Sequence, residues 1–329
     1  MLRMKPIVLV TFRANENDRK IIEEELSKLA DVKYLLDMNQ NYLRRISDRV
    51  RAILTGSGRD LKEDLIKELI NLEMIQTLSA GLDHVPFHII PDHVIVASNA
   101  GGNARAVAEH ALALLLSAVK RIPQHTEKMR KGIWERRKYG VLLKDKVVGI
   151  IGLGHIGREF AKMAKALGMR VYGINRSGQT DVDVDFIGTL RDLDRVLRQA
   201  DFILIALPLT RETKGLIGEN EFRLMKRNVI LVNVGRGDVI DQKALYEFLR
   251  TNPGAIAALD VWWRYPKRDE PTFQDYPFHK LENVIMTPHI AGFSPEIREN
   301  VIRNAVENIA RFLRGEKPRN IAKKEDYIQ

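Results

Sequence analysis

Apolar and polar positions along the first hundred residues repeat a pattern of strands and helices. Two stretches, 16–30 and 62–71, carry apolar residues at helical spacing and predict amphipathic helices. Short apolar runs predict β-strands at 6–11, 32–36, 52–55, 74–78 and 94–98. This alternation predicts a small unit built around a parallel sheet.

The rest of the chain predicts a second and larger unit of the same class. A long helical segment runs from 104 to about 122, and a helix at 295–313 follows the last strand. Between them, helices alternate with strands at 147–151, 170–174, 202–206, 229–233, 256–260 and 284–287. The polar, basic tail is expected to be partly disordered or packed as a strap. A chain of 329 residues suggests two domains, so we predict an α/β protein with two doubly wound parallel-sheet domains.

A glycine motif stands at the start of this larger unit. Residues 147–157, VVGIIGLGHIG, are an apolar run that ends in G-x-G-x-x-G, and a helical pattern follows at once. Gly152 would permit a tight turn, Gly154 would let a pyrophosphate approach the backbone, and Gly157 would let the helix pack against the strand. The helix N-terminus would offer unpaired N–H groups to phosphates. The motif therefore predicts a dinucleotide-binding site.

Composition narrows the function classes. Hydrophobic residues make up 45% and charged residues 29%, as in globular proteins, and the absence of cysteine excludes disulfides, thiolate chemistry and cysteine-based metal sites. The formal charge of +10 comes from Lys and Arg scattered beside Glu and Asp, so we expect no nucleic-acid partner. The longest apolar stretch, 106–119, is too short to span a bilayer. We expect a cytoplasmic protein with no metal site, and the wealth of Lys, Arg, Glu and Ile is typical of thermophiles.

Five further segments follow one another in a distinctive order. They are NAGGNARAVAEHA at 99–111, LPLTRETKGLI at 207–217, NVGRG at 233–237, ALDV at 258–261 and TPHIAG at 287–292. In this order and spacing the chain resembles the D-isomer-specific 2-hydroxyacid dehydrogenases, with a likeness to their glyoxylate and hydroxypyruvate reductases. The resemblance covers nearly the whole chain.

The resemblance implies a split architecture. Residues 1–103 and 293–329 would form a flavodoxin-like substrate domain, and residues 104–292 a Rossmann domain that binds NAD(P). The active site would lie in the cleft between them. It also implies a homodimer in which the helix near 104–122 helps to form the interface.

Two candidate catalytic residues lie in these motifs. Arg236 is flanked by glycines after a strand, where a guanidinium can bind a carboxylate and a reacting oxygen at once. By resemblance, Arg236 orients the 2-oxo acid and polarises its carbonyl. His289 follows a predicted parallel strand, and an imidazole suits proton transfer near neutral pH. By resemblance, His289 is the acid in reduction and the base in oxidation.

The third catalytic position has two candidates. The family places a Glu followed by Pro after the ALDV strand. Counting forward from Asp260 the position holds Tyr265, while counting back from His289 it holds Glu270. We favour Glu270, which keeps the Glu-Pro pair, although it could equally be a solvated loop carboxylate. If Tyr265 fills the position, no carboxylate supports His289 and the pH optimum for reduction is more acidic.

Substrate and cofactor contacts are also implied by the resemblance. The backbone N–H groups of Ala80 and Gly81 would hold the substrate carboxylate. Asn175 stands where NAD-selective proteins carry an acid, and Arg176 and Ser177 follow it, so we predict a preference for NADP(H) with NAD(H) possible. The alternative is that Arg176 stacks on the adenine and both cofactors bind. The expected cofactor-binding residues are Val107, Gly152, Gly154, His155, Ile156, Gly157, Asn175, Arg176, Ser177, Leu207, Pro208, Thr213, Asn233, Val234, Gly235, Asp260, His289, Ala291 and Gly292.

The function that these observations favour is hydride transfer between NAD(P)H and C2 of a small 2-oxo acid. Glyoxylate or hydroxypyruvate is the expected substrate. A 3-phosphoglycerate role is expected less, because no regulatory domain follows residue 329, and formate or phosphite oxidation is a chemically distinct alternative. A non-enzymatic scaffold that senses NAD(H), of the corepressor type, is the alternative from another class.

Overall fold

The computed structural model describes residues 4–137, 139–266 and 275–327. The chain separates into two compact units. Unit 1 combines Met1–Asn103 with Phe293–Gln329, and unit 2 is Ala104–Gly292. Within the described residues, no helix is long and apolar enough to cross a membrane, and no group of three or more His, Cys, Asp or Glu could hold a metal ion.

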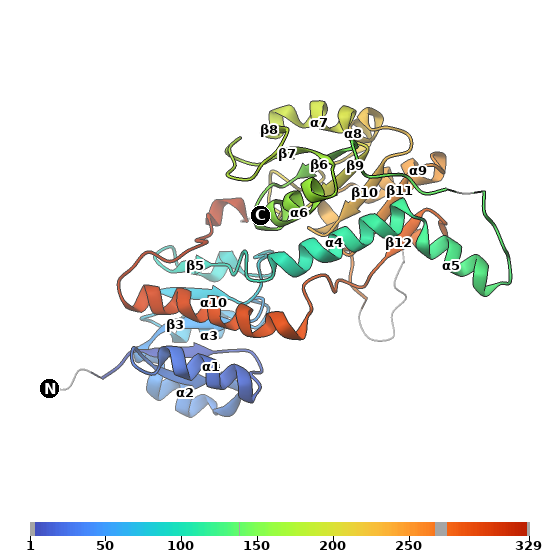
Figure 1. Cartoon of the computed structure of the whole chain (residues 1–329). Helices are drawn as coiled ribbons and strands as arrows, with labels where there is room; N and C mark the ends of the chain where they lie inside the picture. The colour runs from blue at the N-terminus through green and yellow to red at the C-terminus, as the bar shows by residue number, and fades with distance from the viewer. Residues whose placement is uncertain (1–3, 138, 267–274, 328–329) are drawn as a thin grey trace. The chain divides into compact units, whose positions relative to one another are not determined.

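Unit 1 contains a five-stranded parallel sheet in the order β2-β1-β3-β4-β5 (Figure 1). This is the doubly wound order of the flavodoxin type that the family resemblance implies. The strands are β1 (Ile7–Val10), β2 (Asp31–Tyr34), β3 (Val50–Thr55), β4 (Met74–Thr77) and β5 (Ile95–Ala97), and the helices are α1 (Glu16–Leu26), α2 (Gln40–Ile46), α3 (Glu63–Glu68) and α10 (Pro295–Leu313).

The sheet of unit 1 is buried on both faces because side chains alternate along each strand. In β1, Ile7 and Leu9 pack in one core with apolar residues of α2 and α3. Val8 and Val10 pack in the other core with α1 and α10. The late helix α10 is tied to α1 by the buried Asp18, which accepts hydrogen bonds from Arg298 at 2.6 and 3.0 Å.

The tail after α10 is packed as a strap. Ala322 N donates to the Val96 carbonyl at 2.8 Å, and Ser98 N donates to Asn320 at 3.0 Å, so the tail runs along the edge strand β5. Tyr327 stacks on Phe87 with ring centroids 5.1 Å apart. The strap is therefore an ordered part of unit 1 as far as residue 327.

Unit 2 contains a seven-stranded parallel sheet in the order β12-β11-β10-β9-β6-β7-β8. This is the Rossmann order, extended by one strand, and it confirms the predicted fold class. The strands are β6 (Val147–Ile151), β7 (Arg170–Ile174), β8 (Phe186–Gly188), β9 (Phe202–Ile205), β10 (Ile230–Asn233), β11 (Ile256–Leu259) and β12 (Val284–Met286). The helices are α4 (Ala104–Val119), α5 (Ile122–Arg130), α6 (His155–Ala166), α7 (Leu193–Gln199), α8 (Glu219–Leu224) and α9 (Gln242–Thr251).

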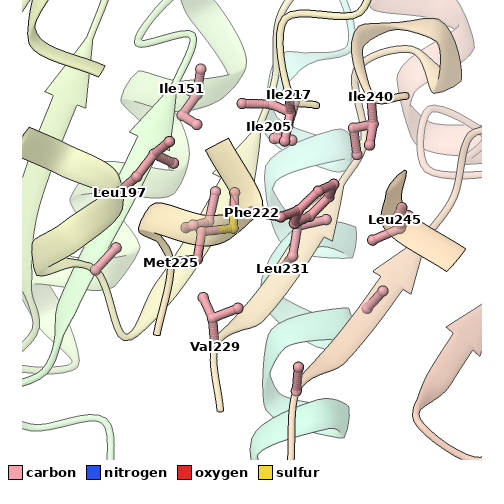
Figure 2. Packing of buried hydrophobic residues seen from close by; sticks show 14 of the residues in the cluster. Ile151, Leu197, Ile205, Ile217, Phe222, Met225, Val229, Leu231, Ile240 and Leu245 are labelled. Atoms are coloured by element: carbon pink, nitrogen blue, oxygen red, sulfur yellow. The ribbon is translucent and has the colours of Figure 1, made fainter. Parts of the chain in front are cut away.

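Two apolar cores cover the two faces of this sheet. Figure 2 shows one of them, in which Leu197, Phe222 and Leu245 of α7, α8 and α9 pack toward strand residues such as Leu231. The other core joins α4 and α6 to the opposite side chains of the same strands. Burial of both faces holds the strand ends, and hence the loops that follow them, in fixed positions.

Four elements differ from the sequence prediction. The structure has two additional helices, α2 and α5, and an additional edge strand, β8. The long helix ends at Val119, because Arg121 adopts a left-handed backbone with φ of 54° and α5 then begins with Pro123 in its first turn. The three additional elements are short, and none is buried along its whole length, so their apolar pattern is weak.

Candidate functional site

Every predicted site segment of unit 2 outside α4 lies at the same edge of the sheet. Because all seven strands are parallel, their carboxyl ends share one edge, where doubly wound folds bind ligands. Six neighbouring strands of the sheet each lead into one predicted site residue. In the order β12, β11, β10, β9, β6 and β7, these residues are, respectively, His289, Asp260, Arg236, Leu207, Gly152 and Asn175. The topology thus aligns segments that lie up to 137 residues apart in the sequence.

The glycine turn between β6 and α6 fits a bound pyrophosphate. Gly152 has a φ of +107°, and a Cβ there would lie 2.7 Å from the Ala206 carbonyl oxygen. A Cβ at Gly157 would lie 2.4 Å from the Gly152 carbonyl oxygen, so the helix packs directly on the turn. Gly154 caps α6, and no heavy atom lies within 4 Å of where its Cβ would stand. The turn is therefore closed toward the protein and open at the N-terminus of α6, where His155 and Ile156 begin the helix.

The loop after β7 is organised by the Asn175 side chain. Its Oδ1 accepts from Gly178 N at 2.7 Å and from Ser177 N at 3.1 Å, and its Nδ2 donates to the Gln179 carbonyl at 2.7 Å. Arg176 and Ser177 are exposed on this loop. Asn175 thus shapes the loop with its own amide, and the loop presents an exposed cation and a hydroxyl in place of a carboxylate.

The loop after β9 carries Leu207, Pro208 and Thr213. Thr213 is buried and donates its hydroxyl proton to the Pro208 carbonyl at 2.6 Å, which closes the loop on itself. Val107 is buried on α4, in the core beneath the sheet edge. These residues are uncharged, so we expect them to contribute to the form of the ligand-binding edge and not to its electrostatics.

Asn233 sets the turn that presents Arg236. The buried Asn233 accepts from Gly235 N at 3.0 Å and donates to the Arg236 carbonyl at 3.0 Å. Val234 N continues the ladder by donating to Ile205 at 3.1 Å. Arg236 is half-buried and donates through Nη1 to the Gly235 carbonyl at 2.8 Å. Both ends of the Asn233 amide thus form hydrogen bonds within the turn. The Arg236 guanidinium is the charged group that the turn carries.

Asp260 organises the turn that carries His289. Its side chain is 1% exposed. It accepts from the Thr287 hydroxyl at 2.6 Å, from Ile290 N at 3.0 Å and from Ala291 N at 2.9 Å. His289 itself has a left-handed backbone with φ of 58°. Asp260 therefore binds the chain on both sides of His289, while Gly292 ends unit 2 just beyond.

His110 of α4 is a member of this network that the sequence reasoning missed. Its Nε2 lies 3.1 Å from the Thr287 hydroxyl and 3.6 Å from Asp260 Oδ1. The available signal was its position three residues after Val107, which places both on one helical face.

Tyr265 lies against the predicted catalytic histidine. The Tyr265 and His289 rings stack with centroids 5.2 Å apart and an interplanar angle of 30°. Glu270, the favoured candidate for the third catalytic position, lies outside the described residues.

The predicted substrate residues Ala80 and Gly81 belong to unit 1, in the loop after β4. Ser79 braces this loop by donating to the Gly81 carbonyl at 2.8 Å, and Asn99 N donates to the Ser79 carbonyl at 3.0 Å. Within the described residues, the N–H groups of Ala80 and Gly81 donate no hydrogen bond. A separate cavity of about 310 Å³ lies between α5 and the end of α9, and it is lined by none of the predicted site residues.

A seven-stranded parallel sheet with a glycine turn at its topological switch point defines the dinucleotide-binding class of α/β proteins. The match to known families is more specific. The protein-family model described as "D-isomer specific 2-hydroxyacid dehydrogenase, NAD binding domain" matches residues 112–291. The chain belongs to the D-isomer-specific 2-hydroxyacid dehydrogenase family.

Individual relatives span several activities. The chain is 36% identical to a D-3-phosphoglycerate dehydrogenase of Archaeoglobus fulgidus, over 88% of this chain and 54% of that protein, so it spans about half of that relative's length. It is 31% identical to a glyoxylate reductase of Pyrococcus furiosus, over 98% of this chain and 96% of that one. An acyclic imino acid reductase solved with NADPH and D-Arg matches with a TM-score of 0.76 and 26% identity, covering 97% of this chain and all of that one.

Proposed function

We propose that this protein is an NAD(P)-dependent D-2-hydroxyacid dehydrogenase that reduces a small 2-oxo acid, with glyoxylate or hydroxypyruvate as substrate. The observation that carries the proposal is the turn at 287–291, which Asp260 fixes so that a histidine stands at the ligand-binding edge. The glyoxylate reductase relative supports this substrate class, because the two chains match over nearly their whole lengths.

In this mechanism a bound nicotinamide supplies the hydride to C2 of the 2-oxo acid or accepts it in the reverse direction. Arg236 binds the substrate carboxylate and the C2 oxygen, and its positive charge offsets the negative charge that develops on that oxygen. The protonated His289 gives its proton to the same oxygen, which yields the 2-hydroxy acid and leaves a neutral imidazole. Ala80 and Gly81 contribute N–H groups to the carboxylate.

The residues of unit 2 also support a preference for NADP(H). The loop at 175–179 carries Arg176 and Ser177 on its surface, and the Asn175 amide is occupied within the loop. A guanidinium and a hydroxyl suit a 2′-phosphate, whereas a carboxylate in this place would repel it. We propose NADP(H) as the preferred cofactor and NAD(H) as the weaker one.

A homodimer is part of the same proposal. Several large apolar side chains on and after α5 are exposed, among them Ile122 at 54%, Met129 at 53% and Trp134 at 76%. We propose that a second copy of this chain covers them in the homodimer. Light scattering coupled to size exclusion should give twice the chain mass of 37.6 kDa.

The test is a panel of 2-oxo acids assayed with NADH and NADPH in parallel. We expect turnover with glyoxylate or hydroxypyruvate, and a loss of roughly 100-fold or more in kcat/KM for Arg236→Ala and His289→Ala. The exposed residues Arg191 and His88 offer matched controls, and Arg191→Ala and His88→Ala should keep full activity. A wild-type protein that binds cofactor tightly and turns over no 2-oxo acid would favour the nucleotide-sensing scaffold instead.

A further inference from the structure

The backbone on both sides of His289 is fixed by two neighbours. Asp260 accepts hydrogen bonds from residues 287, 290 and 291. Trp262 adds a third anchor, because its indole N–H donates to the Thr287 carbonyl at 3.0 Å. These bonds set where the Cα of His289 lies, but none of them touches the imidazole. A contact on the ring itself would restrict the plane of the imidazole.

Tyr265 supplies such a contact. Its ring lies 5.2 Å from the imidazole, centroid to centroid, at an interplanar angle of 30°. Its hydroxyl oxygen accepts from Trp262 N at 3.4 Å, so the ring is also tied to the residue that anchors the turn. Tyr265 is 39% exposed. It stands five residues after Asp260 and before a proline, at one of the two positions where the family resemblance expects a glutamate, the other being Glu270.

We propose that Tyr265 is a positioning residue for His289, whose aromatic face holds the imidazole plane and favours the protonated form of the ring. The proposal rests on the proposed function for its role in proton transfer. A cation within about 6 Å of an aromatic face is attracted by the ring quadrupole. The tyrosine therefore stabilises the imidazolium relative to an aliphatic side chain, although by less than a paired carboxylate would.

Other ionisable groups among the described residues also lie near the turn. Asp260 binds the turn through backbone N–H groups and the Thr287 hydroxyl, and His110 of α4 lies 3.6 Å from Asp260. Arg264 precedes Tyr265 and is exposed, and Glu270 lies beyond the described part of the chain. A change confined to Tyr265 leaves these groups in place.

The experiment compares three variants under identical conditions. Tyr265→Phe keeps the aromatic face, and Tyr265→Leu removes it. Tyr246→Leu is a matched control, because Tyr246 packs on Tyr276 and Phe278 in the same unit, with centroids 5.3 and 5.5 Å apart. The reductive kcat, the KM values and the pH dependence of kcat would be measured for each.

We expect Tyr265→Leu to lower the reductive kcat roughly tenfold, with the cofactor KM little changed. Its activity should decline at a pH lower by roughly half a unit, because the imidazole loses its proton more readily without the aromatic face. Tyr265→Phe should follow the wild type. A Tyr265→Leu enzyme with the wild-type pH profile, or one affected no more than Tyr246→Leu, would overturn the proposal.

A second measurement does not depend on turnover. The imidazole protons of His289, assigned by comparison with His289→Gln, should show an upfield ring-current shift in the wild type and in Tyr265→Phe. Their NMR titration midpoint should be the same in both. Absence of a ring-current shift would refute the stacking even in an active enzyme. A present shift in a protein that reduces no 2-oxo acid would leave the stacking intact and refute the proposed function.

Discussion

Replacing Asp260 by asparagine should disrupt the turn that carries His289 without changing the size of the side chain. The aspartate carboxylate accepts from one hydroxyl and two backbone N–H groups, at 2.6, 3.0 and 2.9 Å. An asparagine has one acceptor oxygen and one NH₂ group, whereas both carboxylate oxygens of Asp260 accept hydrogen bonds. In either orientation of the amide, its NH₂ group would therefore face an N–H donor of the turn. The lost charge-assisted bond costs about 1.5–3 kcal/mol, and the bonds that survive weaken by about 1 kcal/mol each. The free energy of unfolding of unit 2 should fall by about 3–5 kcal/mol.

The assay pairs thermal unfolding with steady-state kinetics. We expect Asp260→Asn to unfold roughly 10 °C below the wild type and to lose roughly 100-fold in kcat, because a small displacement of His289 spoils its alignment with the substrate. Asp241→Asn is the matched control: Asp241 caps α9 through one bond from Ala244 N at 2.7 Å, and asparagine caps nearly as well. If Asp260→Asn were as stable and as active as Asp241→Asn, the reasoning about this turn would be wrong.

Three other substitutions test separate parts of the site. Gly152→Ala should weaken cofactor binding at least tenfold by calorimetry, since its φ of +107° and the Ala206 carbonyl at 2.7 Å leave no room for a Cβ; retention of wild-type affinity would contradict the assigned turn. Asn175→Asp should lower NADPH affinity roughly tenfold or more while sparing NADH, because the new carboxylate repels a 2′-phosphate, and an unchanged NADPH/NADH ratio would argue against this loop as the selector. Burial opposes ionisation of Asp201, but hydrogen bonds from Lys226 and a backbone N–H outweigh it and hold its pKa below the usual value; the stabilisation is therefore present near neutral pH and disappears as pH falls through the folded-state pKa. Asp201→Asn should cost about 1–2 kcal/mol in denaturant melts at pH 7 and almost nothing at pH 2, and a constant difference would count against this assignment.

The sequence predicted the strands well because both faces of each sheet are buried, so the central strands are almost continuously apolar. It failed where that signal is weak, as in the three-residue edge strand β8. The end of α4 was missed because Arg121 adopts φ of 54° in a sequence with no glycine at that point, although Pro123 in the next turn was a usable signal. The location of Arg236 and His289 at one edge of the sheet was predictable, because each follows a strand of a sheet predicted to be parallel.

The contacts that organise the site could not be predicted in the same way. His110 and Thr287 meet across 177 residues of sequence, and no local pattern in either segment specifies its partner. The sequence showed that Asn175 replaces a carboxylate at the end of β7. It did not show that the Asn175 amide hydrogen-bonds to its own loop and stabilises it. The first contact depends on how α4 packs against the end of β12, which only the assembled fold sets. The second depends on the backbone path of the loop, which its residue types alone do not specify.

The energetics of the 287–291 turn indicate that hydrogen bonds within the protein hold the backbone of His289 in place. A left-handed backbone at a residue other than glycine costs about 1–3 kcal/mol, although histidine tolerates it better than most. Against this stand three hydrogen bonds to a buried carboxylate, each worth about 1.5–3 kcal/mol. The bonds exceed the strain even at the lower limits of their range. Under the proposed function, substrate binding then has no need to order this turn, and its binding energy is available for the transition state.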